Sequence, residues 1–241
     1  MAKTIVVLGA RNLGGAIIDR FLELGWNAAG VARSEETLER VRQRGALAID
    51  ADAADVASLT DALRTARARL GSLDAVVNAV SAARPTGGPF GGGPLATADL
   101  DAFRGWTAAV AEQAFVFLSV GAAALRESTG GEGGALIQIT GGSSRRAMPG
   151  KGLWAAGAFA TRALVQAAAQ ELRSEGIHAA LLAVDATIES PKTAAFTRDV
   201  SPDALADMGE IAGAVACLVH QGSRALTHEL VVTPAGERWV P

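Results

Sequence analysis

The sequence contains no tyrosine, and this absence limits the chemistry available to the protein. Its 241 residues also include a single cysteine and three histidines. A mechanism that uses a phenol as proton donor is therefore excluded, as are an internal disulfide and a metal site built from several cysteines. A single cysteine suits a reducing compartment, so we expect a cytoplasmic protein without a metal site.

Extremes of charge and long uncharged apolar runs are also missing. The chain has 22 basic and 25 acidic residues and a formal net charge of −3, which argues against a nucleic-acid binder. Its first residues lead into an apolar segment without a signal peptide, and no uncharged run is long enough to cross a bilayer. We therefore expect a soluble protein that binds neither nucleic acid nor membranes, with a packed core.

What the chain does contain is a regular alternation of short apolar runs and helix-like segments. We predict strands at 4–8, 27–32, 46–49, 73–78, 135–140, 179–184 and 229–232. Helices are predicted at 14–24, 56–70, 99–126, 153–174 and 211–220, and another runs from an N-cap at Ser34 to about residue 44. This alternation predicts an α/β protein with a doubly wound Rossmann fold, in which helices cover both faces of a seven-stranded parallel sheet.

We find no domain boundary in the chain. Glycine and proline concentrate in residues 84–94, but the alternation of strands and helices resumes afterwards. We therefore interpret this segment as a surface loop and predict one dinucleotide-binding domain over residues 1–241.

The first predicted strand leads into Gly9-Ala10-Arg11-Asn12-Leu13-Gly14-Gly15, which opens a predicted helix. Glycines between a strand and a helix allow a tight turn and let backbone N–H groups approach a pyrophosphate. The position of these glycines, between a strand and a helix, predicts a dinucleotide site.

From this turn onward, the chain resembles the short-chain dehydrogenase/reductase family, whose fingerprint is Gly-x-x-x-Gly-x-Gly. Gly9 and Gly15 match the outer glycines of the fingerprint, whereas Leu13 replaces the middle one and Gly14 stands beside it. The segment 52–55 resembles the family's segment beside the adenine, and 70–79 resembles its fourth strand, with Asn78 in place. The segment 187–191 resembles the one that contacts the nicotinamide amide.

Arg33 decides which dinucleotide we expect. Sites that prefer NAD usually place an acid at the end of the second strand, but the chain there reads Val31-Ala32-Arg33. A guanidinium pairs well with a 2′-phosphate, and Arg11 adds a second cation, so we predict NADP(H) rather than NAD(H). The predicted cofactor-binding residues are Gly9, Arg11, Asn12, Leu13, Gly15, Arg33, Asp52, Ala53, Asn78, Ala79 and Ile188.

The positions that carry the family's Ser, Tyr and Lys hold none of these residues. Counting from the helix after the fifth strand puts Trp154 at the Tyr position, Ala158 at the Lys position and Gly141 at the Ser position. The family's Asn falls on Glu112 or Gln113. An indole does not ionise usefully, so Trp154 cannot act as a general acid.

Ligands of an open parallel sheet lie outside the carboxyl ends of its strands. At that end, Ser143 and Thr140 are the candidate oxyanion donors, and Asp185 or Glu189 the candidate acid or base. Residues that we interpret as structural or surface residues are His178, His220, His228, a buried Cys217, and Arg145 with Arg146 in a solvated turn.

The alanine-rich face Ala155–Ala169 and the apolar stretch Ala108–Leu125 of the long helix indicate close helix packing, and in the family these helices form the subunit interface. The resemblance therefore implies a homodimer or homotetramer. Three functions stay open at this point: an NADP(H)-dependent oxidoreductase of unknown small-molecule substrate with weak or non-standard catalysis, a catalytically silent dinucleotide sensor or partner subunit, and a non-redox cyclase, isomerase or lyase.

Overall fold

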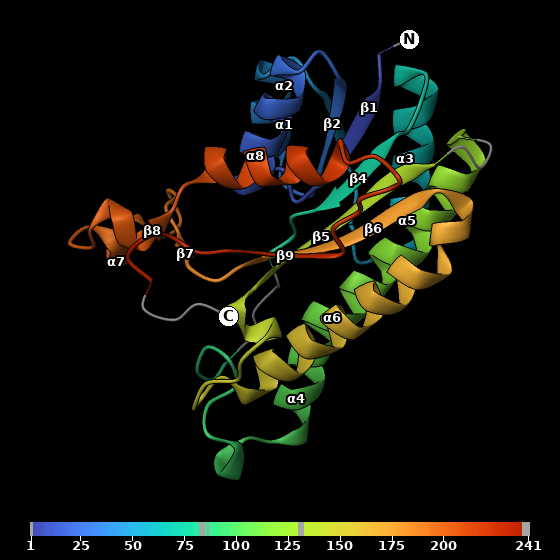
Figure 1. Ribbon diagram of the computed structural model, residues 1–241. Helices are drawn as coiled ribbons and strands as arrows, with labels where there is room; N and C mark the ends of the chain where they lie inside the picture. The colour runs from blue at the N-terminus through green and yellow to red at the C-terminus, as the bar shows by residue number, and fades with distance from the viewer. Residues whose placement is uncertain (1, 82–84, 86, 130–132, 238–241) are drawn as a thin grey trace.

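The computed structural model of the chain describes residues 2–81, 85, 87–129 and 133–237 (Figure 1). Seven parallel strands form one sheet in the order β3-β2-β1-β4-β5-β6-β9. β1 to β3 are added toward one edge of the sheet and β4 onward toward the other, so the strand order switches between β1 and β4. This is the predicted doubly wound topology. The strands are β1 (Thr4–Leu8), β2 (Asn27–Ala32), β3 (Leu47–Asp50), β4 (Ala75–Asn78), β5 (Gly134–Gly141), β6 (Ile177–Val184) and β9 (Glu229–Val232).

Helices cover both faces of the sheet, as predicted (Figure 1). Successive side chains of a strand point to opposite faces, so Val6 and Leu8 enter one apolar core while Ile5 and Val7 enter the other. The first core includes α3 (Val56–Leu70), α5 (Gln113–Thr129) and α6 (Gly152–Glu171). The second includes α1 (Leu13–Glu23), α2 (Glu35–Gln43) and α8 (Met208–Val219).

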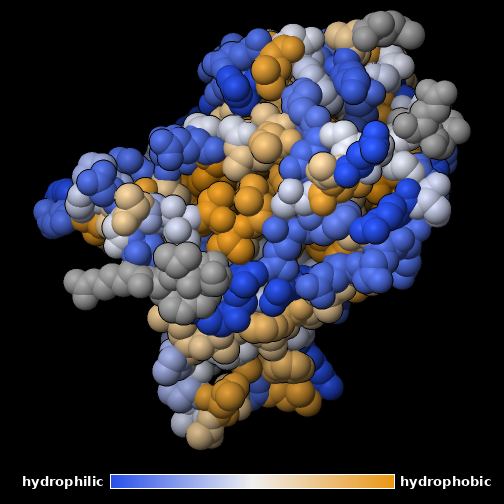
Figure 2. All heavy atoms as spheres, viewed as in Figure 1, coloured by the Kyte–Doolittle hydropathy of each residue, from blue (hydrophilic) through white to orange (hydrophobic). Residues whose placement is uncertain are grey.

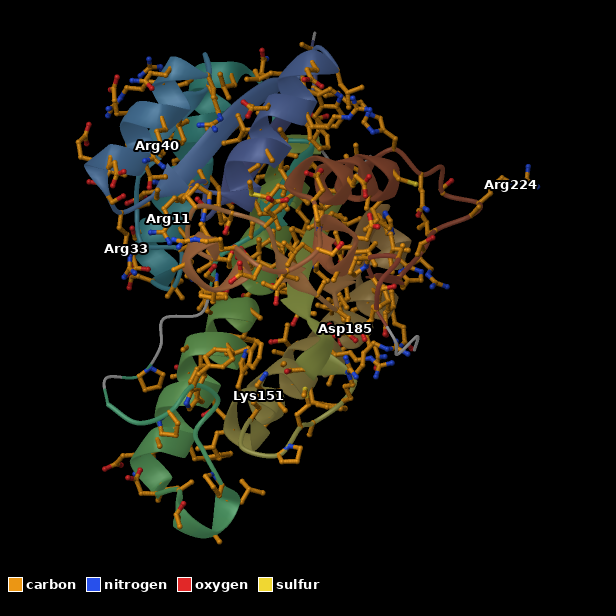
Figure 3. All side chains as sticks on the ribbon, turned by 90° about the vertical axis from the view of Figure 1, so that its left-hand side faces the viewer. Arg11, Arg33, Arg40, Lys151, Asp185 and Arg224 are labelled. Atoms are coloured by element: carbon orange, nitrogen blue, oxygen red, sulfur yellow. The ribbon has the colours of Figure 1, made fainter. Side chains whose placement is uncertain are left out.

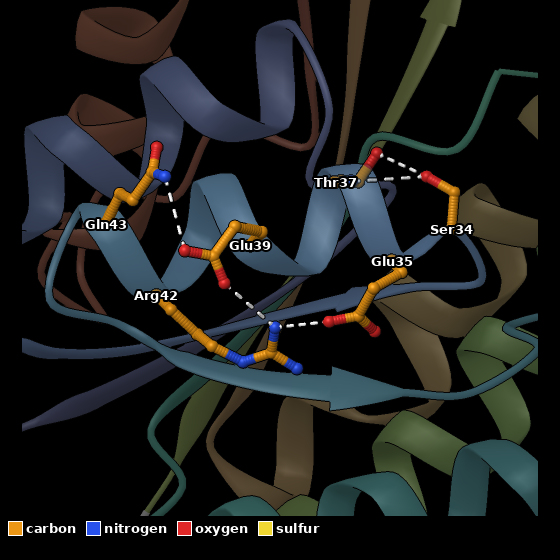
Figure 4. Close-up of polar contacts among 6 residues, drawn as sticks. All are labelled: Ser34, Glu35, Thr37, Glu39, Arg42 and Gln43. Carbon is orange, nitrogen blue, oxygen red and sulfur yellow. Dashed lines mark hydrogen bonds and ion pairs between the residues drawn. The ribbon is translucent and has the colours of Figure 1, made fainter.

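Ser34 caps α2, as the sequence predicts. Its hydroxyl accepts a hydrogen bond from the backbone N–H of Thr37 at 3.3 Å (Figure 4). On the outer face of the helix, Arg42 pairs with Glu35 and Glu39. These exposed ion pairs contribute little individually, and the cap fixes where the helix begins.

The predicted helix 99–126 is divided into three parts. α4 (Leu100–Thr107) and α5 are joined by a π-helical turn over Ala108–Glu112. The stretch Leu100–Ser128 is long and apolar enough to cross a membrane by length and composition alone. Half of its most apolar window is buried, and α5 lies in the core between α3 and α6, so we interpret it as a core helix.

Two further short strands and a short helix were not predicted. β7 (Thr187–Ile188) and β8 (Leu205–Ala206) pair with each other beyond the end of β6, and α7 (Ala194–Thr197) lies between them. The segment 84–94 is not simply a surface loop, because Gly91 and Gly93 are buried where it meets the start of α6. Residues 84 and 86 of this segment lie outside the described residues.

Candidate functional site

The turn after β1 brings the backbone of the chain close to the end of β4. Gly9 has a φ of +80°, and a Cβ atom on it would lie 2.8 Å from the carbonyl oxygen of Ala79. A Cβ atom on Gly14 would lie 2.4 Å from the carbonyl oxygen of Gly9. The turn therefore needs glycine at both positions. Asn12 makes no side-chain capping hydrogen bond to α1, which leaves the helix start suited to a phosphate.

Gly14 shapes the turn of the candidate site, although the fingerprint did not point to it. The fingerprint pointed to Leu13 and Gly15, yet Gly14 makes the close approach to Gly9, and Leu13 packs against the second core. Gly15 lies against Arg44, whose guanidinium would be 3.1 Å from a Cβ atom there. The adjacent glycines Gly14 and Gly15 could have indicated this position from the sequence, because one of the two must face the turn.

Arg33 and Asp52 meet at the ends of β2 and β3. An Arg33 Nη1 atom lies 3.3 Å from Asp52 Oδ2, and both side chains are largely exposed. The glycine turn is tied to the same edge, because the N–H groups of Gly9 and Ala10 both donate to the carbonyl of Val31. Figure 3 shows Arg11 and Arg33 close together on this side of the molecule. The edge thus presents two cations and one carboxylate.

Asn78 is fully buried at the end of β4 and holds a polar network. Its side-chain amide donates to Gln113 and to Gln138, both at 2.8 Å, and its oxygen accepts from the N–H of Val80 at 3.2 Å. Gln113 also donates to the carbonyl of Ala53 at 3.4 Å. The network links β4, β5 and α5 with the turn after β3. Gln138 was not assigned from the sequence, although a long polar residue inside an apolar strand was a signal.

The long helix does not present Glu112 or Gln113 to the position of Ala158. Glu112 is exposed, and Gln113 belongs to the Asn78 network. The residue that faces α6 at this level is Val110, whose Cβ would lie 2.9 Å from a Cβ atom on Gly157. The π-helical turn shifts the helix register here, so spacing alone could not place the position.

Trp154 lies over the end of β5. A Cβ atom on Gly141 would be 3.7 Å from its six-membered ring. Ala158, one turn further along α6, is 1% exposed. The three residues that we predicted at the family's catalytic positions therefore lie near one another, and together they present an indole, an Hα and a methyl group. None of them can transfer a proton to an oxyanion.

Ser143 lies in a short 3₁₀ turn, Gly142–Ser144, directly after β5. Its side chain is buried, and its Oγ atom makes no hydrogen bond to another described residue. The Ser144 hydroxyl already donates a hydrogen bond to the carbonyl of Gly141 at 2.9 Å, so its proton is engaged. Thr140 is half-buried near the end of the same strand. Ser143 is thus a buried hydroxyl without a hydrogen bond to another described residue, two residues after Gly141, and Thr140 is the half-buried alternative directly before Gly141.

Asp185 follows β6 and packs against the same turn. A Cβ atom on Gly142 would lie 1.8 Å from Asp185 Oδ1, so this carboxylate needs glycine at 142. Arg146 approaches Asp185 Oδ1 at 3.3 Å, whereas Asp185 Oδ2 is buried without a hydrogen-bond partner among the described residues. Glu189 is exposed, and Ile188 is half-buried in β7. Of the two candidate acids, Asp185 is the buried one.

The pair Arg145 and Arg146 is not a solvated turn, contrary to our prediction. Both side chains are mostly buried, and Arg145 pairs with Glu229 at the start of β9 while Arg146 pairs with Asp185. Arg162 of α6 also pairs with Glu229, at 2.8 Å. The sequence suggested solvation because the acids that pair with these arginines are distant in the chain.

The histidines lie away from the carboxyl ends of the strands, as predicted. His178 is the second residue of β6 and His228 directly precedes β9, and burial lowers the pKa of His178. Cys217 is exposed on α8, so the prediction of a buried thiol was wrong. Among the described residues, no cluster of His, Cys, Asp and Glu could hold a metal ion.

Comparisons with known proteins agree with the fold. The family model described as short chain dehydrogenase matches residues 3–199. No curated protein matches the chain significantly by sequence.

Solved structures share the fold over nearly the whole chain. A short-chain type dehydrogenase/reductase from Mycobacterium ulcerans superposes with a TM-score of 0.82 at 20% identity, over 97% of this chain and 89% of the other. An alcohol dehydrogenase from Thermococcus sibiricus, complexed with 5-hydroxy-NADP, gives 0.76 at 21% identity over 100% of both chains. A metagenomic short-chain oxidoreductase in complex with NADP gives 0.74 at 22% identity over 96% of both chains.

Proposed function

Because this chain belongs to the short-chain dehydrogenase family, we propose that it binds a nicotinamide dinucleotide at the carboxyl ends of β1, β2 and β4. The observation that carries the proposal is the turn from Gly9 to Gly14, where close backbone contacts leave no room for Cβ atoms. Such a turn lets a pyrophosphate reach backbone N–H groups. The cofactor, when bound, supplies hydride transfer. The residues proposed to surround it include Asp52, Ala53, Asn78, Ala79 and Ile188.

The proposed preference is for NADP(H). Arg33 and Arg11 offer cations at the edge where the 2′-phosphate would lie, and the exposed contact of Arg33 with Asp52 is weak enough for a phosphate to replace. Asp52 opposes this preference, but it is already engaged, since its Oδ1 accepts a hydrogen bond from Ala54 N at 2.9 Å. The NADP and 5-hydroxy-NADP complexes of two structural neighbours support the same choice.

The proposed activity is a slow NADP(H)-dependent oxidation or reduction of a small molecule. Trp154 and Ala158 cannot supply or tune a proton, so a carbonyl oxygen held at Gly141 would depend on the Ser143 hydroxyl as hydrogen-bond donor, with Thr140 as the second candidate. Asp185 and Arg146 would fix the turn that carries Ser143, because Asp185 packs directly on Gly142.

A catalytically silent dinucleotide sensor or partner subunit is the second candidate. The observation that favours it is the contact of Trp154, a ring without a titratable group that we predict at the family's acid position, with the end of β5. Such a protein would keep the cofactor site and lose turnover. The same fold can support an oxidoreductase or a silent sensor, so the chemistry of the site distinguishes the two functions.

Titration calorimetry with NADPH and NADH tests the cofactor proposal directly. We expect NADPH to bind more tightly than NADH; equal or reversed affinities would contradict the preference, and no binding of either would overturn the site. A panel of ketones, aldehydes and secondary alcohols, followed at the nicotinamide absorbance, then separates the two functions. Measurable turnover that needs the protein supports the oxidoreductase, whereas tight NADPH binding without turnover supports the sensor.

A further inference from the structure

Three aromatic rings pack into a cluster beside the end of β5. Phe90 lies between two indoles, with ring centroids 4.7 Å from Trp154 and 5.6 Å from Trp106. Trp106 is buried, Trp154 is half-buried and over Gly141, and Phe90 is 39% exposed. We call Phe90, Trp106 and Trp154 the aryl wall. Trp154 lies at the proposed reaction centre, and Phe90 is the ring of the aryl wall that is most exposed to solvent.

The loop that carries Phe90 is fixed to the start of α6. The N–H of Gly93 donates to Gly150 O at 3.0 Å, and the N–H of Trp154 donates to Gly91 O at 3.4 Å. A Cβ atom on Gly91 would lie 2.7 Å from the Cα of Lys151. These backbone contacts before and within the first turn of α6 hold Phe90 against Trp154. The wall is therefore preorganised.

Lys151 adds a cation beside Phe90, the exposed ring of the wall. Its Nζ atom lies 5.8 Å from the centroid of Phe90, within the range of a cation–π contact. No ion pair joins Lys151 to another described residue, whereas Arg145 and Arg146 in the preceding turn both have acidic partners. Figure 3 shows Lys151 below Asp185, toward α4. The exposed ring of the wall thus lies beside a positive charge that no described acid neutralises.

We infer that the aryl wall and Lys151 bind an aromatic ring that carries an anionic group, and that this is the substrate class of the proposed oxidoreductase. The inference rests on the proposed function, since it takes the end of the wall at Trp154 to be the reacting end. A flat ring gains stacking on Phe90 and Trp154, an anion pairs with Lys151, and a cationic ligand is repelled. The anion is a carboxylate or a phosphate, and both bind the same ammonium.

Binding of four small probes tests this inference on the full chain. Benzoate and phenyl phosphate carry the ring and the charge, benzamide lacks the charge, and cyclohexanecarboxylate lacks the aromatic ring. We expect chemical-shift titrations of the protein to show benzoate or phenyl phosphate binding at least about threefold more tightly than both controls. The tighter of the two anions identifies the source of the negative charge. Equal affinities for all four probes would overturn the inference.

Variants assign the binding to these residues. Lys151→Gln should weaken the anionic aryl probe about tenfold without changing benzamide binding, and Lys151→Arg should restore most of the affinity. Phe90→Leu should lower the affinity for the anionic aryl probe to the affinity for cyclohexanecarboxylate. Lys3→Gln is the matched control, because Lys3 lies over Trp26 in the same kind of contact, at 5.6 Å, elsewhere in the molecule. If Lys3→Gln and Lys151→Gln behave alike, the assignment is wrong.

Titration of NADPH into the same samples separates this inference from the proposed function. NADPH binding without selective binding of the aryl anions overturns the aryl-anion site and leaves the cofactor proposal. Selective binding of the aryl anions without NADPH binding overturns the cofactor proposal and leaves the aryl-anion site.

Discussion

At the scale of the residue, Arg33 is the side chain that should decide cofactor choice. We predict that Arg33→Asp weakens NADPH binding roughly tenfold to hundredfold and changes NADH binding far less, because the variant puts a carboxylate where the 2′-phosphate would lie. Calorimetry with both cofactors measures the two effects. Arg224→Asp is the control, since it makes the same charge change at an exposed position distant from Arg33 in Figure 3. Equal losses for NADPH and NADH would contradict the assignment.

Ser143 is the second residue whose role can be measured. We predict that simple ketones and secondary alcohols turn over well below the usual enzymatic range of about 1–10³ s⁻¹ even with saturating NADPH, because the proton donor at the family position is missing. Ser143→Ala should lower the residual rate at least about tenfold. Thr140→Val is the paired variant. If substantial rates survive both substitutions, the oxyanion assignment is wrong and Asp185 is the next residue to change.

Some residue positions followed from counting along the chain, and others did not. Gly141, Trp154 and Ala158 were placed from one another by fixed spacing, because a strand, a short turn and a helix start connect them. The contact between Arg146 and Asp185 spans 39 residues. Because this contact depends on β5 and β6 lying side by side, local sequence patterns do not indicate it.

At the scale of the element, the glycines of α1 and α8 should respond in opposite directions. Gly14→Ala forces a Cβ atom within 2.4 Å of the carbonyl oxygen of Gly9, so we predict a loss of about 1–3 kcal/mol in unfolding free energy and weaker cofactor binding. Gly213 lies inside α8, and a Cβ atom there would meet nothing within 4 Å. Gly213→Ala should stabilise the protein by about 0.5–1 kcal/mol. Denaturant unfolding measures both changes.

The start of β6 should make stability depend on pH. Burial lowers the pKa of His178, nearby His228 lowers it further, and the hydrogen bond to the carbonyl of Thr227 opposes both. An unfolded histidine titrates near pH 6.5, so the unfolded chain takes up a proton first as the pH falls. Stability is therefore fully present above about pH 6.5 and decreases below it.

Denaturant midpoints between pH 5 and pH 8 test this prediction. His178→Gln should show a smaller decrease below pH 6.5 than the unchanged protein, because it removes the group whose protonation costs free energy in the fold. His220→Gln, at the end of α8, is the control. An unchanged pH profile in His178→Gln would show that other groups cause the decrease.

Elements were predictable where their periodicity was undisturbed. All seven strands of the sheet and its covering helices lie close to the predicted ranges, because alternate strand residues such as Val6 and Val7 are apolar and enter the two cores. The π-helical turn at Ala108–Glu112 was not predictable, since its residues continue the same apolar pattern. Val110 lies within that turn and packs against Gly157, whereas Glu112 is exposed and Gln113 joins the Asn78 network.

At the scale of the whole molecule, two exposed phenylalanines indicate self-association. Phe115 on α5 is 56% exposed and Phe159 on α6 is 41% exposed, and Figure 2 shows further apolar surface over the lower end of the molecule, where α4 and α6 lie. An exposed apolar helix face is unusual in a monomer. We predict that light scattering at low micromolar concentration gives at least twice the chain mass of 24.5 kDa.

Charge substitutions locate the surface that associates. Phe115→Asp and Phe159→Asp should shift the mass toward that of one chain, because burying an unpaired carboxylate in an interface is costly. Phe196→Asp is the control, since Phe196 is 65% exposed on α7, away from both helices. A monomer in the unchanged protein, or an oligomer insensitive to both substitutions, would contradict the prediction.

The aryl wall also gives the protein an optical property. Because the chain has no tyrosine, its ultraviolet emission comes from the four tryptophans essentially alone. Trp106 and Trp154 lie beside the proposed reaction centre, whereas Trp26 packs against Phe21 and His220 at a distance from it. The reduced nicotinamide ring absorbs where tryptophan emits, so a bound reduced cofactor whose nicotinamide lies near the reaction centre would quench Trp154 and Trp106 by energy transfer. The wild-type chain therefore carries its own unlabelled reporter of occupancy, and Trp154→Phe would weaken its signal.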